Sequence, residues 1–140
     1  MALRVLIDLN VLLDALQQRK PFAWEAGEIL AAAETGALEG WWAAHHVTTL
    51  FYLYAKGVSS REARRVLTEL MIFLKVAPIT QGVIERALQL PLKDFEDAVT
   101  AAASAEIGAS YLVTRNQKDF AGSPVPVLSP VELLKLLSSL

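Results

Sequence analysis

Short apolar runs alternate along the chain with stretches in which apolar residues recur every three or four positions. The short runs predict buried strands at residues 5–7, 40–44, 75–79, 111–113 and 125–128. The helical spacing predicts helices over residues 9–18, 21–35, 48–56, 59–73, 80–90, 95–107 and 129–140. Strands that are apolar on both faces and alternate with helices indicate a parallel sheet covered by helices on both sides. The expected fold class is therefore α/β.

Residues that start and stop helices support these boundaries. Pro21 fits the first turn of one helix and Gly36 the position just past its end. The pairs Ser59–Glu62 and Ser129–Glu132 have the spacing of capping boxes, in which each side chain bonds the other's free backbone N–H. Asp94 has the position of an N-cap for the helix that follows it. No repeat, linker or low-complexity segment interrupts the series.

Composition narrows the class of protein. The chain has 140 residues, 54% of them hydrophobic, and a formal net charge of -2, which excludes disordered, collagen-like and coiled-coil classes and predicts one domain over residues 1–140. It contains no cysteine, no apolar run long enough to span a bilayer and no secretory leader, so we expect a cytoplasmic protein with no membrane partner. The charge excludes a nucleic-acid partner held by bulk positive charge, but not a local site.

Three of the five aspartates lie where the chemistry of a parallel sheet is expected. Asp8 follows the first strand, Asp97 lies in the first turn of its helix, and Asp119 follows the fourth strand. Ligands of such sheets bind beyond the carboxyl ends of the strands. Converging carboxylates repel one another unless a cation neutralises them, and Mg²⁺ or Mn²⁺ with hard oxygen ligands can activate water against a phosphodiester.

Each aspartate also has an ordinary interpretation. Asp94 is more simply a helix cap, and Asp119 equally fits a cap for the turn at Phe120. Asp14 fits the solvent side of its helix. Asp8 differs, because an unpaired carboxylate beside a buried strand costs several kcal/mol, which favours a functional role.

Three blocks of sequence resemble the PIN-domain family, the metal-dependent ribonuclease fold of many VapC-like toxins. They are residues 6–14 (LIDLNVLLD), 94–98 (DFEDA) and 112–120 (LVTRNQKDF), and they come in the family's order. The resemblance implies a three-layer α/β/α sandwich around a parallel sheet of about five strands. It also implies acidic residues gathered around Mg²⁺ or Mn²⁺ at the sheet's carboxyl edge.

Matched residue by residue, the resemblance gives roles to particular side chains. Asp8 and Asp97 take the positions of family acids that hold the metal. The expected catalytic set is Asp8, Asp97, Asp119 and Asn116, and the expected supporting residues are Asn10, Thr114, Arg115 and Asp94.

Two departures from the family pattern bear on activity. The family usually carries a glutamate on the helix after the second strand, whereas residues 48–54 contain no acid and resemble a PIN subgroup with a Thr-Thr and tyrosine signature. Asn116 stands where the family has a carboxylate. Fewer negative ligands predict weaker metal binding. A PIN-like RNA-binding or protein-interaction module with weakened chemistry is therefore the alternative to an endoribonuclease.

Other residues carry weaker signals. His45 and His46 follow the second strand and could supply a proton or a phosphate contact, although solvent-facing or capping histidines are the more ordinary interpretation. Arg61, Arg64 and Arg65 form a basic helix face that is more simply a solvated surface. A phosphoacceptor receiver domain shares the α/β pattern but needs an acidic pair after the first strand, which Asp8 and its neighbour do not make.

Partners follow from apolar excess and from the resemblance. The stretches 48–56 and 131–140 carry more apolar residues than one helix face requires, which predicts a homodimer surface. The resemblance implies dimers and, in the toxin class, an antitoxin that blocks the site. The leading expectation is a metal-dependent endoribonuclease acting on RNA, as the toxin of a toxin–antitoxin pair.

Overall fold

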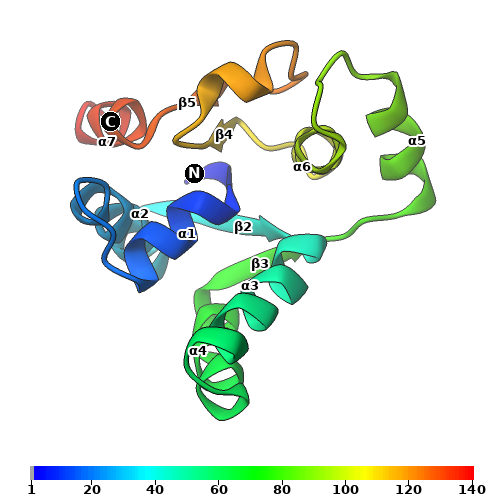
Figure 1. Cartoon of the computed structure of the whole chain (residues 1–140). Coiled ribbons are helices and arrows are strands. Elements are labelled where there is room, and N and C mark those ends of the chain that lie inside the picture. Colours follow the sequence, from blue (N-terminus) through cyan, green and yellow to red (C-terminus); the bar gives the residue numbers. More distant parts are fainter. Residues whose placement is uncertain (1) are drawn as a thin grey trace.

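A computed structural model describes residues 2–140, and its centre is a five-stranded parallel sheet (Figure 1). The strands are β1 (Leu3–Ile7), β2 (Leu38–Ala43), β3 (Leu74–Ala77), β4 (Tyr111–Val113) and β5 (Val127–Leu128). Their order in the sheet is β3-β2-β1-β4-β5, with all four neighbouring pairs parallel. The predicted α/β/α sandwich around a parallel sheet is therefore confirmed.

Helices cover both faces of this sheet. They are α1 (Leu9–Leu16), α2 (Ala23–Thr35), α3 (Ala44–Gly57), α4 (Ser60–Phe73), α5 (Gln81–Gln89), α6 (Phe95–Glu106) and α7 (Pro130–Ser138), with a 3₁₀ helix, η1 (Gln117–Phe120), after β4. In Figure 1, α3 and α4 form a hairpin that extends away from α5 and α6. No helix within residues 2–140 is long and apolar enough to cross a membrane.

The central strand β1 divides its side chains between two cores. Val5 and Ile7 pack with residues of α1, α2, α3, α4 and α7, whereas Leu6 packs with residues of α5 and α6. This alternation follows from the period of two in a strand. Small side chains let α6 lie close to the sheet, since Ala101, Ala102 and Ala103 are fully buried. The sandwich thus holds the first turn of α6 beside the carboxyl end of β1.

The predicted helix signals hold in part. Ser129 and Glu132 form the expected capping box. At Ser59 only half of one forms: the Ser59 side chain accepts from the Glu62 N–H, but the Glu62 carboxylate pairs with Arg65 instead of returning to the cap. Pro21 was expected within the first turn of α2, but the helix begins at Ala23, two residues later.

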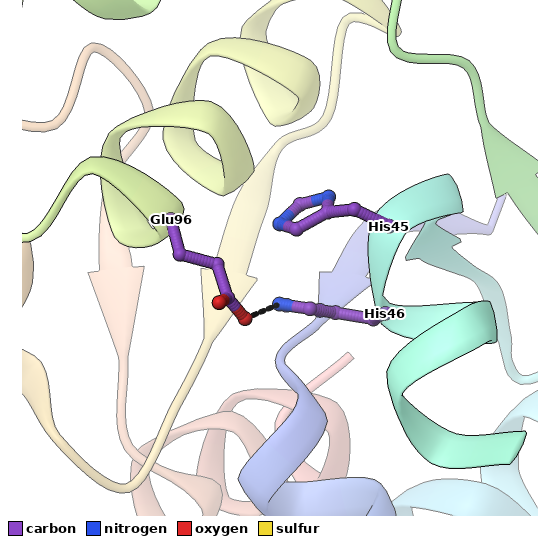
Figure 2. A group of neighbouring side chains, drawn as sticks. All are labelled: His45, His46 and Glu96. Atoms are coloured by element: carbon purple, nitrogen blue, oxygen red, sulfur yellow. Dashed lines mark ion pairs between the residues drawn. The ribbon is translucent and has the colours of Figure 1, made fainter. Parts of the chain in front are cut away.

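Helix α3 begins four residues earlier than the spacing predicts. It starts at Ala44, directly after β2, and its N-cap residue Ala43 contributes no side-chain hydrogen bond. His45 and His46 therefore lie in the first turn of a helix rather than in a loop, facing Glu96 of α6 (Figure 2). The expectation of solvent-facing or capping histidines is wrong for His46, which is only 2% exposed.

Candidate metal centre

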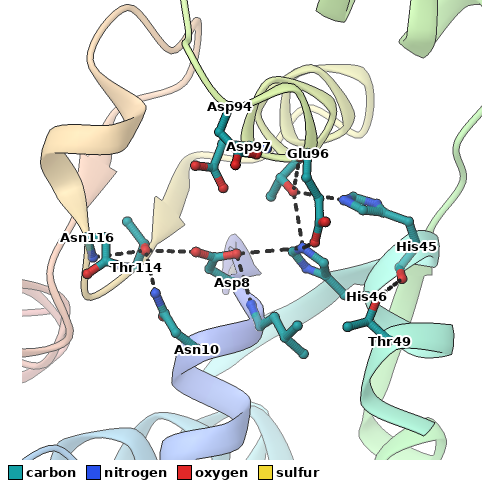
Figure 3. A network of polar contacts seen from close by, with 12 residues as sticks. Asp8, Asn10, His45, His46, Thr49, Asp94, Glu96, Asp97, Thr114 and Asn116 are labelled. Carbon is teal, nitrogen blue, oxygen red and sulfur yellow. Dashed lines mark hydrogen bonds and ion pairs between the residues drawn. The ribbon is translucent and has the colours of Figure 1, made fainter. Parts of the chain in front are cut away.

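Asp8 lies at the point where β1 ends and α1 begins (Figure 3). One carboxylate oxygen accepts from the Leu9 backbone N–H at 2.9 Å, and the other accepts from the Thr114 hydroxyl at 2.8 Å. The residue is 6% exposed, and burial raises the pKa of its carboxyl above the ordinary value. Two hydrogen bonds and an extended backbone thus hold a buried carboxylate in one orientation.

Asn10 and Thr114, both predicted as supporting residues, lie beside Asp8. The Thr114 hydroxyl oxygen accepts from the Asn10 side-chain amide at 3.2 Å and from the Asn116 backbone N–H at 3.1 Å. The Asn10 side-chain oxygen accepts from the Arg115 N–H at 3.4 Å. These contacts tie the segment after β4 to α1, so β1 and β4 deliver their polar ends to one place.

The start of α6 contributes Asp94 and Asp97 to this group. Asp94 is its N-cap and accepts from the Asp97 N–H at 3.0 Å, as predicted. Burial, followed by the negative charges of Asp94, Asp8 and Asp119, raises the pKa of Asp97 from 3.8 to about 7. Within residues 2–140, no lysine or arginine forms a salt bridge with these four aspartates. The four carboxylates at this edge of the sheet therefore have no direct lysine or arginine partner.

Asp119 and Asn116 lie on the exposed side of this group. Both are solvent-exposed, with Asp119 on η1 and Asn116 directly before it. Asp119 is near enough to raise the pKa of Asp97. No described residue donates a hydrogen bond to the Asp119 carboxylate, so the alternative role as a turn cap finds no support. Its oxygens face solvent rather than a neighbouring donor.

Arg115 and Asp14 differ from their predicted places. Asp14 was expected on the solvent side of α1 but is 1% exposed, because the Arg115 guanidinium binds its carboxylate at 2.8 and 3.2 Å. That guanidinium also stacks over the ring of Phe22, 4.2 Å from the centroid. The Arg115 backbone N–H therefore contacts Asn10 at the site, whereas its guanidinium pairs with Asp14 of α1.

His46, for which the sequence favours a solvent-facing or capping place, lies instead beside Asp8. Its Nε2 lies 3.8 Å from an Asp8 oxygen and 3.7 Å from a Glu96 oxygen, beyond hydrogen-bond distance (Figure 3). Burial lowers the pKa of His46 to about 3, so the ring is neutral at neutral pH. The burial of His46 could have been predicted from a helix that begins at Ala44, because that start turns residue 46 toward the sheet.

A surface hollow adjoins the acidic group. It has a volume of about 340 Å³, lies between the start of α6 and η1, and is lined in part by Lys93, Asp94, Lys118 and Asp119. The two lysines were not singled out from the sequence, because neither belongs to a basic run. Here they flank the negative centre from two segments far apart in the chain.

The residue types at this edge suit a hard divalent cation, but no three of the four aspartates, all of them described, have carboxylate oxygens within 4.8 Å of one another. Asp8, Asp94, Asp97 and Asp119 offer carboxylate oxygens, which are the ligands that Mg²⁺ and Mn²⁺ prefer. Burial is the largest cause of the raised pKa of Asp97, and the negative charges of Asp94, Asp8 and Asp119 add to it. A bound cation would offset the part of the shift that comes from these charges.

The pH dependence of the free energy of unfolding of the metal-free protein should reveal the raised pKa of Asp97. Because the pKa of Asp97 is about 7 when folded and ~3.9 when unfolded, the folded state binds more protons between these values. The free energy of unfolding in EDTA should therefore fall as the pH rises from about 4 to about 7. Urea denaturation across this range measures the slope, which Asp97→Asn should reduce. An equal slope in the variant would contradict the raised pKa.

Comparisons with known proteins point to one family. A family model described as a PIN domain matches residues 4–118. A chain of a toxin–antitoxin complex from Klebsiella pneumoniae is similar in structure, with a TM-score of 0.69, 25% sequence identity, and coverage of 90% of this chain and 97% of that one. No curated protein sequence matches the chain.

Two further solved structures share the fold at lower identity. VapBC2 from Rickettsia felis, bound to a DNA fragment from its promoter, has a TM-score of 0.70 at 14% identity, covering 91% of this chain and 98% of that one. VapC20 from Mycobacterium tuberculosis, a toxin that cleaves the sarcin-ricin loop, has a TM-score of 0.60 at 14% identity, covering 77% and 86%.

Proposed function

The chain belongs to the PIN-domain family, and we propose that it is a metal-dependent endoribonuclease that hydrolyses phosphodiester bonds of RNA. The observation that carries the proposal is that Asp8, Asp94 and Asp119 act electrostatically on Asp97, and that none of the four forms a salt bridge with a lysine or arginine among the described residues. The raised pKa of Asp97 supports it, because this charge density needs a cation to persist at neutral pH.

We assign roles to the residues around this charge. Asp8 and Asp97 hold Mg²⁺ or Mn²⁺, and Asp119 and Asn116 complete or orient the shell of water. Thr114 and Asn10 fix the Asp8 carboxylate through their hydrogen bonds, and Asp94 fixes the first turn of α6. Arg115 braces the same loop through its backbone. Residues 1–140 act as one PIN-like domain.

The chemistry divides between the cation and the protein. When bound, the cation makes water a better nucleophile at neutral pH and neutralises charge on the scissile phosphate. The protein keeps Asp8 buried and oriented, so that its oxygens do not turn toward solvent. The exposed side, at Asp119 and Asn116, leaves the space through which an RNA strand reaches the centre.

Lys93 and Lys118 are placed to contact the RNA backbone. They line the hollow beside Asp94 and Asp119, where the acidic centre alone would repel phosphate. Replacing both lysines by alanine should weaken RNA binding at 50 mM salt about tenfold and reduce the salt dependence of binding. Fluorescence anisotropy with a single-stranded RNA measures both quantities. The double variant Arg61→Ala with Arg64→Ala, on the exposed face of α4, serves as the matched loss of two positive charges. An equal loss of RNA binding in that variant would contradict the role of the two lysines.

The experiment that tests the proposal is metal removal and return. Dialysis against EDTA should abolish cleavage of a labelled RNA, and millimolar Mn²⁺ should restore it and raise the melting temperature. For the Asp97→Asn variant treated in the same way, Mn²⁺ should neither restore cleavage nor raise the melting temperature, because the variant lacks one of the two proposed ligands. Cleavage that persists in EDTA, or Mn²⁺ that restores the variant equally, would refute the assignment.

A weakened PIN-like RNA-binding or protein-interaction module is the second candidate. Asn116 stands where the family has an acid, and residues 48–54 contain no acid, which favours this candidate. The PIN subgroup that residues 48–54 resemble would share the second of these departures. Under this alternative, millimolar Mn²⁺ neither stabilises the protein nor induces cleavage, while RNA binding remains. The thermal measurement in the metal experiment therefore separates the two functions.

We further propose that the protein is the cytoplasmic toxin of a toxin–antitoxin pair. The similar chain from Klebsiella pneumoniae comes from a toxin–antitoxin complex, which supports an antitoxin partner here. A homodimer is supported by exposed apolar side chains on the α3–α4 hairpin, including Tyr52 at 61% and Ile72 at 80% exposure. Surfaces of this kind are often covered by another chain.

A further inference from the structure

Two histidines and a glutamate face one another beside the acidic centre. His45 and His46 project from the first turn of α3, and Glu96 projects toward them from α6 (Figure 2). One ligand atom from each of the three lies within 4.8 Å of the others. We propose that His45, His46 and Glu96 form a second cation site, which takes a transition-metal ion with a preference for imidazole, such as Zn²⁺ or Co²⁺.

The burial of His46 is the first argument. Its side chain is 3% exposed, yet its Nε2 has only the Thr100 hydroxyl within hydrogen-bond distance, at 3.3 Å. His45 Nε2 lies 3.1 Å from the same hydroxyl. One hydroxyl thus serves two imidazoles that otherwise point at carboxylate oxygens. A buried histidine whose only role is packing does not require a carboxylate opposite its ring nitrogen, whereas the Glu96 carboxylate lies opposite Nε2 of His46.

The tautomers available to the rings are the second argument. A cation needs the lone pair on Nε2 and the proton on Nδ1. Both Nδ1 atoms are buried, and neither has a hydrogen-bond partner within residues 2–140. No donor therefore holds Nδ1 as an acceptor, so a ring proton can move to it. It must move before a cation binds, because the Thr100 hydroxyl donates to the Glu96 carbonyl oxygen at 3.0 Å and can only accept from Nε2–H of either ring.

The spacing is the third argument. The Nε2 of His46 lies 3.7 Å from the Glu96 oxygen, too far for a hydrogen bond. Two ligands bound at ~2.0–2.1 Å to one tetrahedral ion are ~3.4 Å apart, so His46 and Glu96 are within a few tenths of an ångström of that spacing. The ligand atoms of all three residues lie within 4.8 Å of one another. Glu96 is exposed and its carboxylate can move toward the two imidazoles. The cation would replace the bridging role of the Thr100 hydroxyl.

The ligand types decide the class of cation. Two imidazoles and one carboxylate suit Zn²⁺ and Co²⁺, whereas Mg²⁺ prefers oxygen ligands only. The site is therefore distinct in chemistry from the all-oxygen group of Asp8 and Asp97, although His46 lies only 3.8 Å from Asp8. It does not depend on the proposed nuclease activity.

Cation binding to single variants tests this site. Isothermal titration of Zn²⁺ and visible absorption of bound Co²⁺ should detect a site in the wild type that His46→Gln weakens at least tenfold. Thr100→Val, which removes the bridging hydroxyl but no ligand, should keep it, and so should Asp97→Asn. Binding that survives His46→Gln, or that Asp97→Asn alone abolishes, would overturn the proposal.

Nitrogen-15 spectra of the wild type keep the test decisive even where a variant fails to fold. Addition of one equivalent of Zn²⁺ should shift the Nε2 resonances of both histidines, and Mg²⁺ should not. Unchanged resonances with Zn²⁺ would overturn the proposal. Absence of RNA cleavage would refute the nuclease assignment but leave these readouts untouched, so the two failures are distinguishable.

Discussion

Asp8→Asn should reduce Mn²⁺-dependent RNA cleavage by at least about a hundredfold while leaving the protein folded. The substitution removes a negative ligand, and even residues that only orient metal ligands cost about 10–100-fold when changed. It also removes a buried charge whose pKa is raised, so the metal-free variant should be no less stable than the wild type. Initial rates of cleavage and urea denaturation measure the two effects.

Glu34→Gln is the matched control for this variant. Glu34 is an exposed carboxylate on α2, and its neutralisation changes the net charge by the same amount as Asp8→Asn. The control should cleave RNA at the wild-type rate. Equal activity in Asp8→Asn and Glu34→Gln would contradict the assignment of Asp8 as a metal ligand. Loss of activity with a matching loss of folding would show a structural role only.

Asp14→Ala should lower the free energy of unfolding by about 3 kcal/mol, the scale for removing one partner of a buried ion pair. The Asp14 side chain is 2% exposed, and its loss leaves the Arg115 guanidinium, 27% exposed, without its carboxylate. Arg115 precedes Asn116 and follows Thr114, so the loop beside Asp8 should loosen and Mn²⁺ affinity should fall. Urea denaturation and calorimetry report the two quantities.

The double variant Asp14→Leu with Arg115→Met separates the ion pair from the packing. Replacing both partners by apolar residues of similar size should recover most of the lost stability, because no unpaired charge remains. A double variant as unstable as Asp14→Ala would contradict this explanation. A single variant within about 0.5 kcal/mol of the wild type would show that solvent compensates the Arg115 guanidinium in place of the pair.

Local rules predicted the parts of this fold that local interactions determine. The apolar runs locate all five strands, and Asp94, Thr80 and Ser129 cap their helices through side-chain bonds within three residues. Asp8 was identifiable because a carboxylate directly after a buried strand has few ordinary explanations. The positions of these residues follow from contacts close in sequence, which periodicity and capping rules describe.

Contacts between distant residues explain what was missed. Asp14 is buried because Arg115, 101 positions away, neutralises it, and no pattern within α1 contains that partner. The burial of His46 was not predicted because α3 has no side-chain cap at Ala43, so its first turn carries no starting signal. The same reasoning applies to Lys93 and Lys118, which become neighbours of one hollow only in the folded chain.

A crystal soaked in millimolar Mn²⁺, with data collected at an energy where manganese scatters anomalously, tests the central claim most directly. We predict one anomalous peak between the carboxylates of Asp8 and Asp97, with both within bonding distance of the ion. No peak at that position, with the carboxylates arranged as in the metal-free protein, would contradict the account.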